Sequence, residues 1–156
     1  MTEVEANRNV LRERIRKAGY VGNRDWANLQ PLVPVEEFFA EGVNESAVGN
    51  SRIVQFGIAA FAALLGEIDR RDDVSDVVVE IDDDFDGGWP HCGYIFVATA
   101  CSAAEIALWF AAIPPGLVLR AAGPFVRARV IRLEDIDVAP GYQLWALWWN
   151  DDMDEE

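Results

Sequence analysis

The fold of this chain is decided by residues 76–99, DVVVEIDDDFDGGWPHCGYIFVAT. β-branched and aromatic side chains fill the two ends of this stretch, at 77–82 and 94–99, and such runs are typical of strands. The ten residues between Asp82 and Gly93 are acidic and rich in turn-forming residues. A crossover helix needs about a dozen residues or more, so none fits in this gap. The stretch therefore predicts a hairpin in which 77–82 pairs with 94–99.

Three helices are predicted around this hairpin from apolar spacing and capping residues. The first covers 3–18 and the second covers 52–69. The third begins with a capping box of Ser102 and Glu105 and ends before Pro114. It is apolar nearly all round, whereas the second helix has one broad apolar face and is expected at the centre of the core. The predicted core contains Phe56, Phe61, Leu64, Ile95, Val97, Ile106 and Phe110.

Further strand-like runs follow the third helix, at 117–121, 125–131 and 142–149. Together with the hairpin they predict an α+β fold, in which a mixed or antiparallel sheet packs with about three helices. A length of 156 residues suits one domain over 1–150, and we expect the acidic tail 151–156 to be frayed.

Residues 20–49 leave two structures open. Two prolines and three glycines interrupt this stretch, and the sequence between them shows no single periodic pattern. Pro34 is suited to the first turn of a short helix through Ala40, with Glu36 and Glu37 next to it. An extended segment fits the same residues, so the sequence does not choose between the two.

The balance of charge restricts the classes of partner. Thirteen basic and 27 acidic side chains give a net charge of −14. Such a field repels nucleic acid and anionic membranes and attracts basic proteins. The alternative is that the acidity only keeps the protein soluble. The longest uncharged apolar run has 14 residues, between Arg52 and Glu67, which is shorter than the roughly 20 of a spanning helix. With no signal peptide in view, we expect a cytoplasmic protein.

No catalytic apparatus is recognised in the sequence. Cys92 and Cys101 lie at the ends of a predicted strand, about 30 Å apart, so we expect both to be reduced. His91 is the single histidine and has no nucleophile at a characteristic spacing. A phosphate-binding glycine-rich loop is also missing. We therefore expect a protein that is not an enzyme and that has no cofactor and no metal.

An acidic run after the first hairpin strand is the sharpest local feature, and calcium is one interpretation of it. Ten of the twenty residues from Glu67 to Asp86 are acidic. Asp82, Asp84, Asp86 and Gly87 match the first half of an EF-hand loop. The twelfth position of that loop, however, is Gly93 where a bidentate Glu is required. A divalent-metal-responsive module that uses the 82–86 loop is therefore the alternative function.

Phosphoryl transfer is a second interpretation of the same run. The order Asp84, Phe85, Asp86, Gly87 resembles the nucleophile motif of haloacid-dehalogenase-type phosphatases. That family also needs a downstream lysine, and the only lysine here is Lys17. Acidic side chains without a cation beside them repel a phosphate, so the resemblance does not predict this activity.

Binding of a basic protein is the third interpretation and the leading functional one; the remaining alternative is a solvated acidic loop that binds nothing. Asp82, Asp83, Asp84 and Asp86 on a hairpin loop offer a charged surface, with Trp89 as an aromatic anchor. Glu36 and Glu37 are the next candidates for the same partner-binding surface.

Two stretches, NRDWANLQPLVPVEEFF at 23–39 and GYQLWALWWND at 141–151, resemble parts of small acidic bacterial proteins of the toxin-immunity type. The resemblance implies an α/β fold that binds a toxin domain and occludes its active site. It agrees with the acidity, because nuclease and deaminase toxins have basic clefts. We therefore expect a cytoplasmic immunity or inhibitor protein whose partner is a basic toxin domain.

Overall fold

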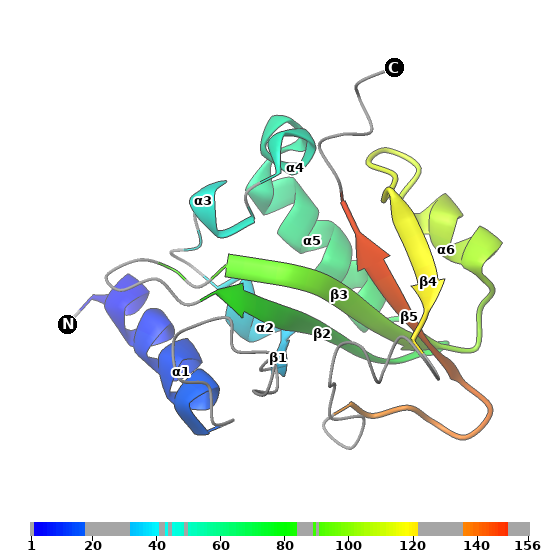
Figure 1. The fold of residues 1–156 in the computed structure, drawn as a ribbon, viewed down its shortest axis with the longest axis horizontal. Helices are drawn as coiled ribbons and strands as arrows, with labels where there is room; N and C mark the ends of the chain where they lie inside the picture. Colours follow the sequence, from blue (N-terminus) through cyan, green and yellow to red (C-terminus); the bar gives the residue numbers. More distant parts are fainter. Residues whose placement is uncertain are drawn as a thin grey trace.

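The computed structural model describes residues 2–17, 32–40, 43, 45–48, 50–83, 89, 91–121 and 136–149, with the backbone alone at 14–17, 45–46, 82–83 and 91. In this part of the chain, five strands form one sheet in the order β1-β2-β3-β5-β4, and every neighbouring pair is antiparallel (Figure 1). The strands are β1 Leu32–Pro34, β2 Val74–Asp83, β3 His91–Thr99, β4 Leu117–Arg120 and β5 Gln143–Trp148. The predicted α+β fold is confirmed.

The predicted hairpin is the centre of the sheet. β2 pairs with β3 in a register that places Val77 opposite Val97 and Val79 opposite Ile95. Both strands are longer than the sequence predicts, because polar residues at their ends also join the ladder. Register shifts occur near Val74 and on both sides of Ile81, and such bulges increase the local twist. This hairpin determines where the two ends of β2 lie, and both ends are acidic.

Helices pack on one face of the sheet and at its two sides. They are α1 Glu3–Lys17, α2 Val35–Phe38, α3 Glu45–Val48, α4 Ser51–Phe56, α5 Ile58–Asp69 and α6 Ala103–Trp109. α1 lies at the β1 side of the sheet and α6 lies at the β4 side (Figure 1). The Ser102 capping box is present, and the Asn50 side chain accepts hydrogen bonds from the N–H groups of Arg52 and Ile53. None of the helices in the described residues is long and apolar enough to cross a lipid bilayer.

The helix predicted over 52–69 is two helices. Gly57 has φ +107°, a conformation that favours glycine, and it ends α4 before α5 begins. The break also changes which residues face the core: the buried residues of α5 are Phe61, Leu65 and Ile68. Phe56 and Leu64 are partly buried and pack against this core from its periphery. They belong to a stripe that would run along an uninterrupted helix.

The remaining core predictions are confirmed: Phe61, Ile95, Val97, Ile106 and Phe110 are buried. Trp149 lies between two of these residues, with its ring centroid 5.1 Å from that of Phe61 and 5.2 Å from that of Phe110. Its Nε1 donates a hydrogen bond to the carbonyl oxygen of Ile113, 3.0 Å away. The end of β5 is thereby held against α5 and the turn after α6.

The two structures that the sequence leaves open near Pro34, an extended segment and a short helix, both occur, one after the other. Pro34 ends β1 opposite Val78, and α2 begins at the next residue. The strands predicted at 117–121 and 142–149 correspond to β4 and β5. The strand predicted at 125–131 and the tail 151–156 lie outside the described residues.

Candidate partner-binding surface

The loop that the sequence singles out is described only at its edges. Asp84 and Asp86 lie outside the described residues. Asp82 and Asp83 are the last residues of β2, where Asp83 is paired with His91, and their side chains are not described. The proposed binding role of these four residues stays a prediction.

Trp89, which the sequence suggests as an aromatic anchor for a partner, is in the core. Only 3% of its surface is exposed, and its Nε1 donates a hydrogen bond to the carbonyl oxygen of Phe38, 2.9 Å away. A buried indole needs such an acceptor for its single donor, and α2 supplies it. Trp89 therefore fixes the chain before β3 to α2, and its ring is packed inside the protein and not presented at the surface.

Glu36 and Glu37 lie on α2, where Glu36 is exposed and Glu37 is half-buried. Glu36 acts electrostatically on Asp69, the last residue of α5, and on Asp76 near the start of β2. Three elements thus bring three carboxylates together. Asp137 adds a fourth, because its backbone N–H donates to Oδ2 of Asp76 at 2.9 Å. We call Glu36, Asp69, Asp76 and Asp137 the β2 acidic cluster.

Burial and mutual repulsion both act on this cluster. Burial is the main cause that raises the pKa of Asp69, and the charges of Glu36 and Asp76 raise it further. Arg70 and the N–H of Val77 oppose that shift. The pKa of Asp76 is also raised, first by burial and then by the charges of Asp137 and Glu36, against hydrogen bonds from the backbone of Asp137 and Val77. These carboxylates are ionised at a free-energy cost that a nearby cation would reduce.

The cluster could not be found from spacing, because Glu36 is far from Asp69 and Asp76 in the sequence. One signal does point to it. Asp69 ends α5, and a negative charge at a helix C-terminus is unfavourable with respect to the helix dipole. An acidic residue in that position does not stabilise the helix, which indicates that Asp69 has another role.

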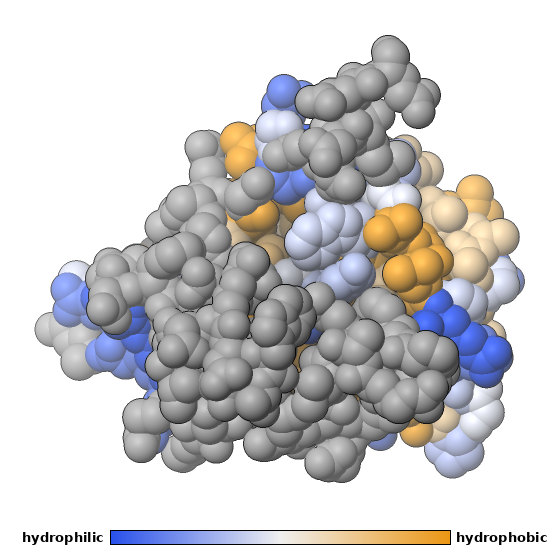
Figure 2. Space-filling model, viewed as in Figure 1, coloured by the Kyte–Doolittle hydropathy of each residue, from blue (hydrophilic) through white to orange (hydrophobic). Residues whose placement is uncertain are grey.

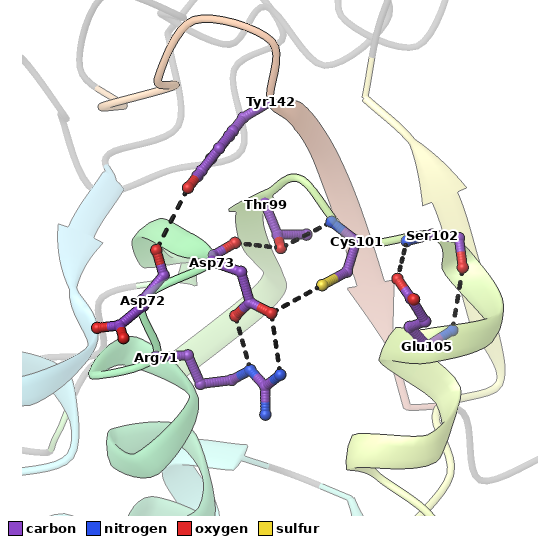
Figure 3. A network of polar contacts seen from close by, with 8 residues as sticks. All are labelled: Arg71, Asp72, Asp73, Thr99, Cys101, Ser102, Glu105 and Tyr142. Carbon is purple, nitrogen blue, oxygen red and sulfur yellow. Dashed lines mark hydrogen bonds and ion pairs between the residues drawn. The ribbon is translucent and has the colours of Figure 1, made fainter.

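A second polar network joins the turn before β2 to the turn before α6 (Figure 3). Arg71 forms two hydrogen bonds with the carboxylate of Asp73, at 2.9 and 3.0 Å, and its guanidinium lies 4.3 Å from the Trp109 ring centroid. The Sγ of Cys101 donates to Oδ2 of Asp73 at 3.1 Å. Thr99 donates its hydroxyl to the carbonyl oxygen of Asp73 and accepts from the N–H of Cys101.

The protonation states in this network indicate a structural role. Hydrogen bonds from Arg71 first, and from Cys101 second, lower the pKa of Asp73 to about 2. Burial, followed by the hydrogen bond to Asp73, raises the pKa of the Cys101 thiol. A thiol with a raised pKa is protonated at neutral pH and is a weak nucleophile. The network therefore connects two turns, and its thiol is not activated.

Glu80 is a functional candidate that the sequence did not indicate. It is fully buried on the sheet, and its Oε1 accepts a hydrogen bond from the N–H of Tyr94 at 3.3 Å. The hydrophobic pattern of β2 assigns this position to a strand but not to the interior. Its carboxylate therefore places a polar group in the interior of the protein.

A cavity of about 410 Å³ opens between the end of β4 and the segment before β5. Its walls are mainly aliphatic, and Arg120 is the charged residue among them: Arg120, Ala121, Ile136, Val138, Tyr142, Gln143 and Leu144. None of the sequence-predicted site residues contributes to it. Within the described residues, no group of three or more His, Cys, Asp or Glu side chains is arranged to hold a metal ion.

The fold and the cluster define an α+β protein with an antiparallel sheet and an acidic surface at the start of its second strand. A family model described as the "Uncharacterized protein YfbO family" matches residues 6–147, and the chain therefore belongs to this family. No curated protein and no solved structure matches the chain.

Proposed function

We propose that this protein is a non-enzymatic binding protein that captures a basic protein partner through the β2 acidic cluster. The observation that carries the proposal is the electrostatic coupling of Glu36, Asp69 and Asp76, which come from α2, α5 and β2. A lysine or arginine placed among them replaces repulsion by attraction. Because two of these carboxylates are partly desolvated, that attraction is stronger than between fully exposed charges.

The net charge of −14 supports the same proposal at long range. Complementary fields raise the rate of association and suppress partners of the wrong charge. The partner we propose is a basic toxin domain, which the protein neutralises by covering its active site. The resemblance of 23–39 and 141–151 to immunity proteins is the support for this narrower statement. The acidic sequence from Asp82 to Asp86 begins at the opposite end of β2, and we propose that the same partner contacts it as well.

A capture experiment with matched variants tests the proposal. The wild-type protein is used as bait in a lysate of its native host, beside the double variant Glu36→Gln, Asp69→Asn. The control is Glu3→Gln, Glu5→Gln, which removes the same charge from exposed positions on α1. We expect a basic protein that is captured by the wild type and by the control and is lost with the double variant.

The salt dependence completes the test. Capture should weaken between about 0.05 M and about 0.5 M NaCl, because screening shortens the reach of the field. If the captured proteins are acidic or neutral, or if both double variants behave alike, then this cluster is not the binding surface.

A further inference from the structure

The cavity between the end of β4 and the segment before β5 has an apolar floor. Ala121, Ile136 and Leu144 line it, and only 5–6% of the surface of each is exposed. They belong to a buried cluster that also holds Val78 and Phe96 and consists of strand and loop residues. The volume of about 410 Å³ lies in the range of about 300–1,000 Å³ that is typical of small-molecule sites. The cavity is therefore large enough for a small apolar ligand.

One wall of this cavity, the segment 136–142, is held in place from its other side. The N–H of Asp137 donates to Oδ2 of Asp76 at 2.9 Å. The hydroxyl of Ser75 donates to the carbonyl oxygen of Asp137 and accepts from the N–H of Ala139. The two neighbours of Asp137 in the sequence line the cavity. Alternate residues of this segment thus face β2 and the cavity, as in any extended chain.

A tight turn fixes the end of the same segment. The N–H of Tyr142 donates to the carbonyl oxygen of Ala139 at 2.9 Å, and Gly141 has φ +82°. Pro140 followed by Gly141 suits the two central positions of a type II turn. The hydroxyl of Tyr142 donates to the carbonyl oxygen of Asp72 at 3.3 Å. Because the wall is formed before any ligand enters, binding has a small ordering cost.

Arg120, an exposed residue, is the charged member of the cavity walls. Figure 2 shows hydrophobic surface along β4 and strongly hydrophilic surface beside the end of this strand, where the cavity lies. Within the described residues, no carboxylate forms an ion pair with Arg120. The net charge of −14 repels anions at long range, but physiological salt screens charges beyond about 8 Å. Contact with Arg120 therefore determines whether an anionic group is accepted.

We propose that this cavity binds a small aliphatic carboxylic acid. The hydrocarbon chain lies on the apolar floor, and the carboxylate pairs with Arg120 at the mouth. One guanidinium balances one negative charge, which favours a carboxylate over a phosphate group that carries more charge. The proposal stands independently of the proposed function, because neither Arg120 nor the floor belongs to the β2 acidic cluster.

An NMR titration of the ¹⁵N-labelled protein with sodium octanoate, in about 0.15 M NaCl, tests this proposal. We expect saturable shifts that are confined to the amides of residues 118–121 and 136–144. Octan-1-ol has the same chain length and no charge. It should shift the same amides and bind about tenfold more weakly, because it forms no charge-assisted hydrogen bond with Arg120.

Three variants separate the contributions of charge and of shape. Arg120→Gln should weaken octanoate about tenfold and leave octan-1-ol unchanged. Val138→Asp places a carboxylate in the wall at a position that is 37% exposed, and it should weaken both ligands. Val10→Asp, at an exposed apolar position on α1, is the matched control and should bind both as the wild type does. Circular dichroism confirms that each variant is folded.

Three results overturn the proposal. The first is the absence of saturable shifts at these amides with octanoate. The second is octan-1-ol binding as tightly as octanoate, and the third is an Arg120→Gln variant with the octanoate affinity of the wild type.

Discussion

The indole Nε1 of Trp89 donates a hydrogen bond to the carbonyl oxygen of Phe38 at 2.9 Å, between residues separated by 51 positions in the chain. Because Phe38 is the last residue of α2 and Trp89 precedes β3, this bond joins the helix that carries Glu36 to the central hairpin. The position of Glu36 relative to Asp76 depends on where α2 lies. A residue in the core therefore supports the acidic surface without being part of it.

Replacing Trp89 should reduce stability. Trp89→Phe leaves the buried carbonyl of Phe38 without its partner and should lower the free energy of unfolding by about 1–3 kcal/mol. Trp89→Ala also removes most of the ring and should lower it by about 3–5 kcal/mol. Urea denaturation measures both values. Unfolding free energies within about 0.5 kcal/mol of the wild type, as is usual for surface substitutions, would place Trp89 outside the core.

Asp69→Asn should stabilise the protein at neutral pH. The pKa of Asp69 is raised in the folded state, first by burial and then by Glu36 and Asp76, so its ionised form destabilises the fold at pH values above that raised pKa. This penalty disappears as the pH falls and the carboxyl takes up a proton. The amide oxygen of Asn can still accept from the N–H of Val77.

Thermal unfolding at two pH values measures this difference. The melting temperature of Asp69→Asn should exceed that of the wild type at pH 7, and the gain should vanish near pH 3. Equal melting temperatures of the two proteins at pH 7 would show that ionised Asp69 does not destabilise the fold.

The pKa of Asp73 is shifted in the opposite direction, to about 2. The contribution of Asp73 to stability is therefore complete above the ordinary pKa of 3.8 and is lost as the pH falls toward 2.

The local features of the fold follow from the sequence, and the distant ones do not. Strand runs around a short acidic connection predict the β2–β3 hairpin, and the Ser102–Glu105 capping box predicts the start of α6. The sequence predicts one helix across Gly57 because the apolar spacing continues through this residue. The break there depends on the φ of Gly57, which is set by how α4 and α5 each pack. The β2 acidic cluster depends on the docking of α2 beside α5, which no spacing between Glu36 and Asp69 encodes. The burial of Trp89 does not follow from the sequence, because its acidic neighbours suggest solvent, while its acceptor lies on a distant helix.

Calcium should bind weakly and without a fixed stoichiometry. The sequence supplies oxygen ligands at Asp82, Asp84 and Asp86, but Gly93 stands where an EF-hand loop has its bidentate Glu. Isothermal titration calorimetry with CaCl2 should therefore show no site of micromolar or tighter affinity. A stoichiometric site of that strength would instead favour the metal-responsive function over the binding of a basic protein.

The two acidic ends of β2 should affect partner binding at different steps. Asp76 and Asp83 are seven residues apart along the strand, about 23 Å, so one partner could contact both ends. Four acidic residues lie within five positions of the sequence at 82–86, and replacing Asp82, Asp83, Asp84 and Asp86 by Asn should mainly slow association. Glu36→Gln with Asp69→Asn removes charges beside partly buried carboxylates. This double variant should mainly speed dissociation, because close desolvated contacts form after encounter.

Surface plasmon resonance with the captured basic partner, at two salt concentrations, measures the association and dissociation rates separately. The loop variant should lose most of the salt dependence of its association rate, and Glu3→Gln with Glu5→Gln should change neither rate. Salt-independent association of the wild type would show that the loop is only a solvated face of the hairpin. The β2 acidic cluster would then have to account for binding by itself.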